Sequence, residues 1–266
     1  MLNNEKVKKI WVFTQKSSFM QRICDYVRMG GKYYIHGVTD TDKIFKTWDK
    51  LVAAYPVFDD KMKAYRARES GQASGRLLMY QNLQAPDKVH WFLLINGTEE
   101  NLPEGEKWLD AEDARTRLYF TGYELGRVTR EGVKKPVWTW KYSQERFQDL
   151  RDSMVAAIRS NRDHDFKIII DKIFGTIGFS GSREQAKSLA KLAREEWKKR
   201  RPNDEMPEVP KGIGWIRRKS DKGIFLRRPK LSPPSKKERP LDTHVSKELL
   251  ETLNQHFQQI DKESEK

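Results

Sequence analysis

The first 142 residues alternate between short apolar runs, which are typical of strands, and longer stretches with helical periodicity. The runs are rich in β-branched and aromatic residues, and short polar connections join consecutive runs, as in hairpins. We therefore expect residues 1–142 to form one α+β domain with a mostly antiparallel sheet. The predicted strands are 8–15, 32–39, 76–83, 88–96, 117–130 and 136–143.

Two helices are predicted between these strands. The first starts at Ser17 or Ser18, either of which can cap a helix, and ends before Gly30–Gly31. The second covers 42–55, where the apolar residues share one helical face. The polar stretch 61–75 lacks such a face, so we interpret it as a connection.

Beyond residue 142 the strand pattern stops and helical periodicity takes over. We predict three helices, over 143–160, 163–174 and 182–201. Ser182 with Gln185 fits a capping box at the start of the third helix, because each side chain can bond to the main chain of the other residue.

A β-hairpin is predicted next, with strands 213–218 and 224–228. Three helices followed by a hairpin is the element order of a winged helix-turn-helix domain. In that architecture the helix after the turn enters the major groove, and the wing contacts the backbone or the minor groove. On element order alone, since no stretch matches a family motif, we assign residues 143–230 to such a winged-helix-like domain.

The remaining residues form two predicted segments. Residues 231–240 are rich in proline and charge, which is typical of a solvated linker. Residues 241–266 predict one amphipathic helix with a short coiled-coil-like seam. Because so short a helix is unstable alone, we expect it to dock on its own domain, on a second copy or on a partner protein.

The net charge of +14 over 266 residues favours a polyanionic partner. Residues 183–240 carry 19 Lys and Arg against 8 Asp and Glu, so this segment holds most of the excess. No apolar run approaches a membrane span, and the N-terminus lacks a secretion signal. With Cys24 as the single cysteine, we expect a cytoplasmic, nucleoid or nuclear protein that binds nucleic acid, DNA in preference to RNA, and not a membrane.

Six cations share a narrow arc of the third predicted helix, opposite its apolar face. Such a ribbon favours contact with phosphates, whereas the alternative is the solvated face of a surface helix. Residues in the first turns would reach base edges, and later ones would meet phosphates. The predicted contacts on this helix are Ser182, Arg183, Gln185, Lys187, Lys191, Arg194, Lys198 and Arg201.

The predicted wing is also rich in cations, at its strand ends and its turn. Arginine's planar fork suits phosphates and guanine edges. The alternative is an edge hairpin protected by charge against aggregation, which needs fewer cations. The predicted contacts are Arg217, Arg218, Lys219, Lys222, Arg227 and Arg228.

Tyr119 and Tyr123 are candidates for a base-stacking platform on the strand 117–130. Aromatic pairs over a core explain the same pattern equally well. The strand does not match the signature of an RNA-recognition motif.

Signs of catalysis are weak in the sequence. The five histidines are scattered, and none forms a metal-binding pair. A strand-borne histidine such as His36 or His90 is a candidate base or ligand, but neither has a neighbouring ligand in the sequence. We therefore predict no catalytic residue, no metal site and no cofactor.

Two functions remain open. The first is a non-enzymatic DNA-binding protein within a larger nucleoprotein assembly, in which the basic helix and the wing grip the duplex. The second is an RNA-binding component of a ribonucleoprotein, in which the aromatic N-terminal sheet and the wing hold RNA. Arg, Lys or Tyr would then perform any metal-independent RNA processing.

Overall fold

The computed structural model describes residues 9–58, 61–129, 135–216 and 220–228. Contacts group the chain up to Arg228 into one unit. The predicted linker and C-terminal helix, over 231–266, lie outside the described residues and stay predictions. Among the helices of the described ranges, none has both the length and the apolarity that crossing a bilayer requires.

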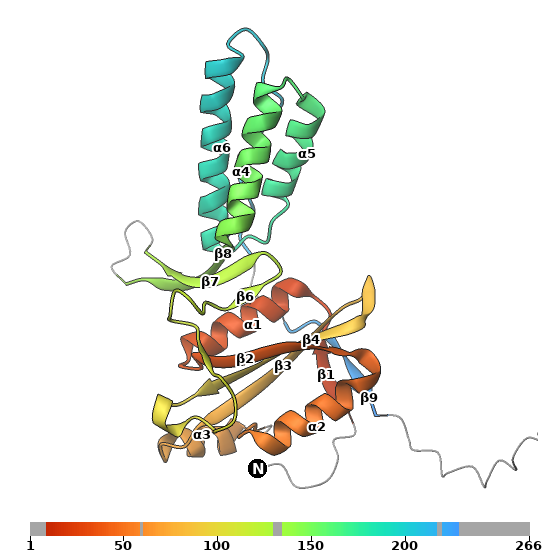
Figure 1. The fold of residues 1–266 in the computed structure, drawn as a ribbon, viewed down its shortest axis with the longest axis vertical. Coiled ribbons are helices and arrows are strands. Elements are labelled where there is room, and N and C mark those ends of the chain that lie inside the picture. Colours follow the sequence, from red (N-terminus) through yellow and green to blue (C-terminus); the bar gives the residue numbers. More distant parts are fainter. Residues whose placement is uncertain (1–8, 59–60, 130–134, 217–219, 229–266) are drawn as a thin grey trace, which may run out of the picture. The chain divides into compact units, whose positions relative to one another are not determined.

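A six-stranded sheet is the main element of the N-terminal half (Figure 1). Its strand order is β5-β2-β4-β3-β1-β9. Its neighbouring strands are antiparallel, except that β1 and β3 run parallel. The predicted α+β class with a mostly antiparallel sheet is therefore confirmed. The strands are β1 (Lys9–Phe13), β2 (Tyr33–Asp40), β3 (Ser74–Asn82), β4 (Ala85–Asn96), β5 (Leu109–Asp110) and β9 (Gly223–Arg227).

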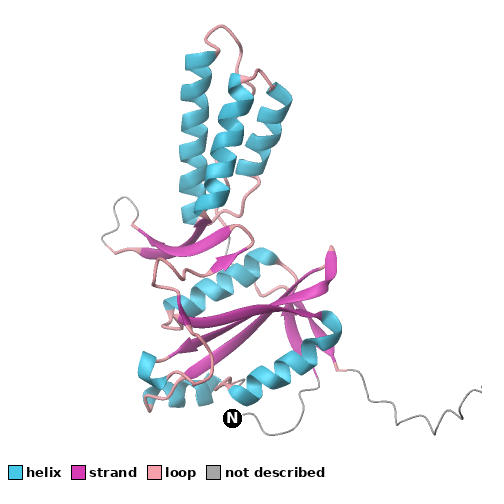
Figure 2. Cartoon of the chain, in the orientation of Figure 1, coloured by secondary structure: helices cyan, strands magenta, loops and turns pink. Residues whose placement is uncertain are grey.

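Helices cover both faces of this sheet (Figure 2). Helix α1 (Lys16–Arg28) buries Phe19 and Ile23 against one face. A 3-10 turn (Thr41–Lys43) leads into α2 (Ile44–Ala54), which buries Trp48 and Leu51 against the other. Successive side chains of a strand point to opposite faces, so each strand contributes to both cores.

Helix α3 (Lys61–Glu69) was not predicted, because the sequence there indicates a connection. Its only fully buried side chain among the described ones is Ala67. A helix that buries so little shows no apolar face in the sequence.

Strand β9 corrects the predicted wing. It pairs along its whole length with β1, and the Trp11 and Phe225 rings lie 4.9 Å apart. Residues 213–216, which were predicted as its partner strand, form no strand, and 217–219 lie outside the described residues. The open edge of β1 takes the place of the hairpin partner, so a segment predicted in the C-terminal domain completes the N-terminal sheet.

A second sheet of three strands has the order β6-β7-β8. The predicted long strand 117–130 is broken by a two-residue turn, with φ of 45° at Thr121 and 81° at Gly122. Left-handed conformations at both positions are typical of tight hairpin turns. Threonine favours strands, which explains why the sequence conceals this turn. The strands are β6 (Tyr119–Phe120), β7 (Tyr123–Val128) and β8 (Val137–Tyr142).

Three helices follow, as predicted, and share a third apolar core. They are α4 (Gln144–Arg159), α5 (Asp163–Phe174) and α6 (Ser180–Arg200). Ser143 caps α4, since its hydroxyl accepts a hydrogen bond from the Arg146 N–H at 3.3 Å.

The predicted capping box at Ser182 is wrong. Helix α6 begins at Ser180, and its first turn packs on β8, where Thr139 Oγ1 accepts a hydrogen bond from the Gly181 N–H at 3.1 Å. Ser182 is fully buried and donates to the Ile177 carbonyl at 2.6 Å. The contact with the second sheet therefore replaces the local cap.

Candidate nucleic-acid interface

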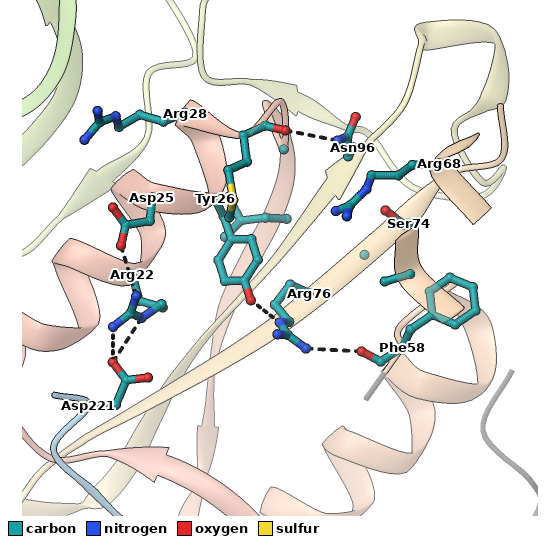
Figure 3. A pocket seen from close by; sticks show the side chains of 15 residues that line it. Arg22, Asp25, Tyr26, Arg28, Phe58, Arg68, Ser74, Arg76, Asn96 and Asp221 are labelled. Carbon is teal, nitrogen blue, oxygen red and sulfur yellow. Dashed lines mark hydrogen bonds and ion pairs between the residues drawn. The ribbon is translucent and has the colours of Figure 1, made fainter. Parts of the chain in front are cut away.

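Helix α1 lines two cavities that share part of their lining, and Figure 3 shows the larger of them. The larger, of about 750 Å³, is completed by α3, β3 and β4. The smaller, of about 280 Å³, is completed by β8, the start of α6 and residues 215–216. Both are lined by Arg22, Asp25 and Arg28, so we treat them as one groove and call it the α1 groove.

Positive charge predominates in the larger cavity. Its lining includes Arg22, Arg28, Arg68 and Arg76 against Asp25 and Asp221. Arg22 donates to Asp25 at 3.0 Å and also pairs with Asp221. Arg28 and Arg68 form no ion pair with a carboxylate of the described ranges, so their charge is available to an anion.

Arg76 is held rigidly in this cavity. Its guanidinium lies 5.3 Å from the centre of the Tyr26 ring and donates to the Tyr26 hydroxyl. It also donates to the Phe58 carbonyl at 3.2 Å, as Figure 3 shows. Neither partner is an anion, so the contacts orient this cation without neutralising it.

An exposed aromatic ring stands at the other end of the groove. The Trp215 side chain is 59% exposed, and the Arg183 guanidinium lies 4.0 Å from its ring centre. The Ile216 N–H donates to the Gly178 carbonyl at 2.9 Å, which fixes the segment. A Cβ at Gly178 would lie 1.9 Å from the Gly214 carbonyl oxygen, so only glycine permits this approach.

The predicted cation ribbon of α6 carries both signs of charge in the structure. Lys187 pairs with Glu184 at 3.4 Å, and Lys191 pairs with Glu195 at 3.8 Å. Arg201 bonds to Asp163 and Asp204. Arg194 and Lys198 are exposed and have no ion pair within the described part of the chain.

Three of the four residues predicted to read base edges, namely Ser182, Arg183 and Gln185, have internal contacts, whereas the fourth, Lys187, is exposed. Ser182 is fully buried, and the Gln185 amide bonds to both main-chain groups of Tyr142, accepting from its N–H at 2.6 Å. Arg183 is half-buried under Trp215. These three side chains stabilise the packing of α6 and contribute little surface to a ligand.

The cations of the predicted wing are separated. Arg217, Arg218 and Lys219 lie outside the described residues. Lys222 and Arg227 are exposed, Arg227 on the edge strand β9. Arg228 donates to Asp49 at 2.7 Å and lies over the Phe45 ring, so it has a structural role.

The predicted stacking platform does not form as a pair. Tyr119 is 50% exposed, but Tyr123 is only 3% exposed. The Tyr123 hydroxyl is hydrogen-bonded to Thr176 at 2.7 Å, and its ring packs on Tyr142. The core interpretation therefore holds for Tyr123.

The tertiary structure also brings together two residues that the sequence separates. His36 on β2 and His90 on β4 lie on one face of the six-stranded sheet as diagonal neighbours. No local pattern signals this pair, because it arises only from the pairing of distant strands. The α1 groove was missed for the same reason, since its arginines come from α1, α3 and β3.

Within the described residues, no three His, Cys, Asp or Glu side chains gather as a metal ion would require. No protein-family model matches the chain, and neither a curated protein nor a solved structure does. The chemistry of the α1 groove and of α6 is therefore the basis for assigning a function.

Proposed function

We propose that the protein binds nucleic acid, with the phosphates of a single strand along the α1 groove. The observation that carries the proposal is an arginine-lined groove in which Arg28 and Arg68 form no ion pair with any described residue, with an exposed Trp215 at one end. Phosphate oxygens suit the planar fork of arginine. A base stacked on an exposed aromatic ring contributes about 1–3 kcal/mol to binding without sequence preference.

The exposed cations of α6 extend this surface. Arg183 joins the two regions, because it stacks on Trp215 at the end of the groove and belongs to the first turn of α6. Arg194 and Lys198 follow on the same helix. A strand that leaves the groove at Trp215 would pass Lys187 and Lys191, which are paired with glutamates, and then reach these two cations.

The second candidate is binding of duplex DNA by the three helices α4, α5 and α6, without a wing. The helix order and the exposed Arg194 and Lys198 support it. Internal ion pairs of Lys187, Lys191 and Arg201 weaken it, because paired cations release fewer counterions. Because these ion pairs weaken the duplex-binding alternative, we favour binding of a single strand in the α1 groove.

Fluorescence anisotropy with the full chain tests the proposal. Labelled single-stranded DNA, single-stranded RNA and duplex DNA of equal length are titrated at matched salt, with polyphosphate as a base-free control. We expect both single strands to bind at least about tenfold more tightly than the duplex, and polyphosphate to bind weakly because it cannot stack on Trp215. Preferred binding of the duplex would favour the alternative that α4, α5 and α6 bind DNA, and no binding at low salt would refute both.

A further inference from the structure

His36 and His90 form a pair at the sheet face that α1 only partly covers. His36 is opposite Phe92, and His90 is opposite Val38, so the two histidines are diagonal neighbours on adjacent strands. The backbone positions of diagonal neighbours in an antiparallel sheet lie about 7–8 Å apart. Two side chains on one face at this separation can both reach a single phosphodiester, whose oxygens must come within about 2.6–3.2 Å of the imidazole nitrogens.

Both imidazoles are oriented by aromatic contacts. The His36 ring stacks on Phe92 with 5.2 Å between centres and an angle of 15°. The His90 ring meets Phe120 edge to face at 5.4 Å. These contacts fix the orientation of both rings. His36 is exposed and His90 is half-buried, so a ligand has access to both imidazoles.

A positive charge lies beside the same aromatic cluster. The Lys16 ammonium is 5.9 Å from the Phe120 ring centre and donates to the Thr121 carbonyl at 3.4 Å. Arg146 donates to the same carbonyl at 3.4 Å. These two cations are suited to attract a phosphate and to stabilise the negative charge that develops on it.

The two histidines are poised to hold different protonation states. Partial desolvation by the surrounding aromatic side chains lowers the pKa of His36, and desolvation lowers the pKa of His90 as well. The charge of His36 lowers the pKa of His90 further. An imidazolium thus stands beside a neutral imidazole over part of the pH range, which is the arrangement that paired general acid and base catalysis needs.

We propose that this pair cleaves RNA by metal-independent transesterification, with His90 as general base and His36 as general acid. His90 takes the proton of a ribose 2′-hydroxyl, and the 2′ oxygen attacks the adjacent phosphorus. The bond from phosphorus to the 5′ oxygen breaks, and His36 gives its proton to that oxygen. The products are a 2′,3′-cyclic phosphate and a 5′-hydroxyl, with one proton taken and one given and no redox change.

The activity rests on the proposed binding of nucleic acid and deepens it by selecting RNA, because DNA has no 2′-hydroxyl to attack. The α1 groove and the histidine pair share no lining residue, so binding and cleavage can be lost separately. That separation allows one set of variants to test each claim by itself.

The test uses the full chain with a labelled single-stranded RNA in the presence of EDTA, and mass spectrometry of the products. We expect a 2′,3′-cyclic phosphate end and no cleavage where the nucleotide is 2′-deoxy. H36A and H90A should each lower the cleavage rate at least about 100-fold, which is the smallest contribution that a general acid or base typically makes to a rate. H164A, which changes an exposed histidine of α5, is the matched control and should keep the full rate.

The pH dependence gives an independent readout. Among the described residues, the other titratable groups near the pair are Tyr34, Asp40, Tyr80, Lys88, Lys16 and Arg146. Burial raises the pKa of both tyrosines, and hydrogen bonds from Lys43 and Lys88 lower the pKa of Asp40 to about 2. Burial lowers the pKa of Lys16 to about 8. The rate should therefore follow a bell with its maximum below pH 6.5, set by the two histidines.

Each outcome decides one claim. RNA that binds but stays intact with the wild-type protein overturns the cleavage proposal and leaves the binding proposal standing. Cleavage that persists in both H36A and H90A overturns the histidine assignment. Retained RNA affinity in H36Q and H90Q, with lost cleavage, supports it and excludes unfolding as the cause. Absence of both binding and cleavage refutes both proposals.

Discussion

Replacing Arg28 and Arg68 together by glutamine tests the α1 groove quantitatively. Neither side chain has an ion pair within the described ranges, so each is expected to contribute a full phosphate contact. For a single strand, one such contact contributes about 0.7 to the slope of log K against log salt. The double variant should therefore flatten the slope by about 1.4 and weaken binding about 25-fold at 0.1 M salt.

The assay is a set of anisotropy titrations between about 50 and 200 mM salt, where the slope is well defined. The control replaces Arg151 and Arg162 by glutamine, which removes the same charge from α4 and from the residue before α5. These arginines pair with Asp152 and Asp165 and do not line the groove. Equal slopes for the two double variants would refute the groove, because net charge alone would then explain the binding.

Two further predictions concern stability. The buried Tyr142 hydroxyl donates to the Ile173 carbonyl at 3.0 Å, so Y142F should remove this hydrogen bond and lower the free energy of unfolding by about 1–3 kcal/mol. Y119F, which changes an exposed tyrosine, should leave the free energy of unfolding unchanged. Thermal unfolding measures this, at about 2–4 °C per kcal/mol for a domain of this size. Burial, with the charge of Arg146, lowers the pKa of Lys16 from 10.5 to about 8. The unfolded chain then binds more protons between pH 8 and 10.5, so the free energy of unfolding should rise over this interval, and urea denaturation of K16M should lack that rise.

The sequence by itself determined the elements that depend on local pattern. The helices α1, α2, α4 and α5 appear close to their predicted bounds, because an apolar stripe at helical spacing must be buried whatever covers it. The β3–β4 hairpin is likewise local, since a short connection joins its strands. The excess of positive charge is also a property of the sequence alone.

The tertiary structure decided which of these elements meet. The partner of β9 is β1, more than 200 residues earlier, and no local pattern distinguishes it from a hairpin partner. Packing on β8 took Ser182 and Gln185 away from the surface, and internal ion pairs reduced the available charge of α6. The α1 groove and the pair of His36 and His90 exist only because strand order juxtaposes distant residues. Side chains from different elements come together through long-range packing, whereas sequence periodicity reports only neighbours three or four positions away.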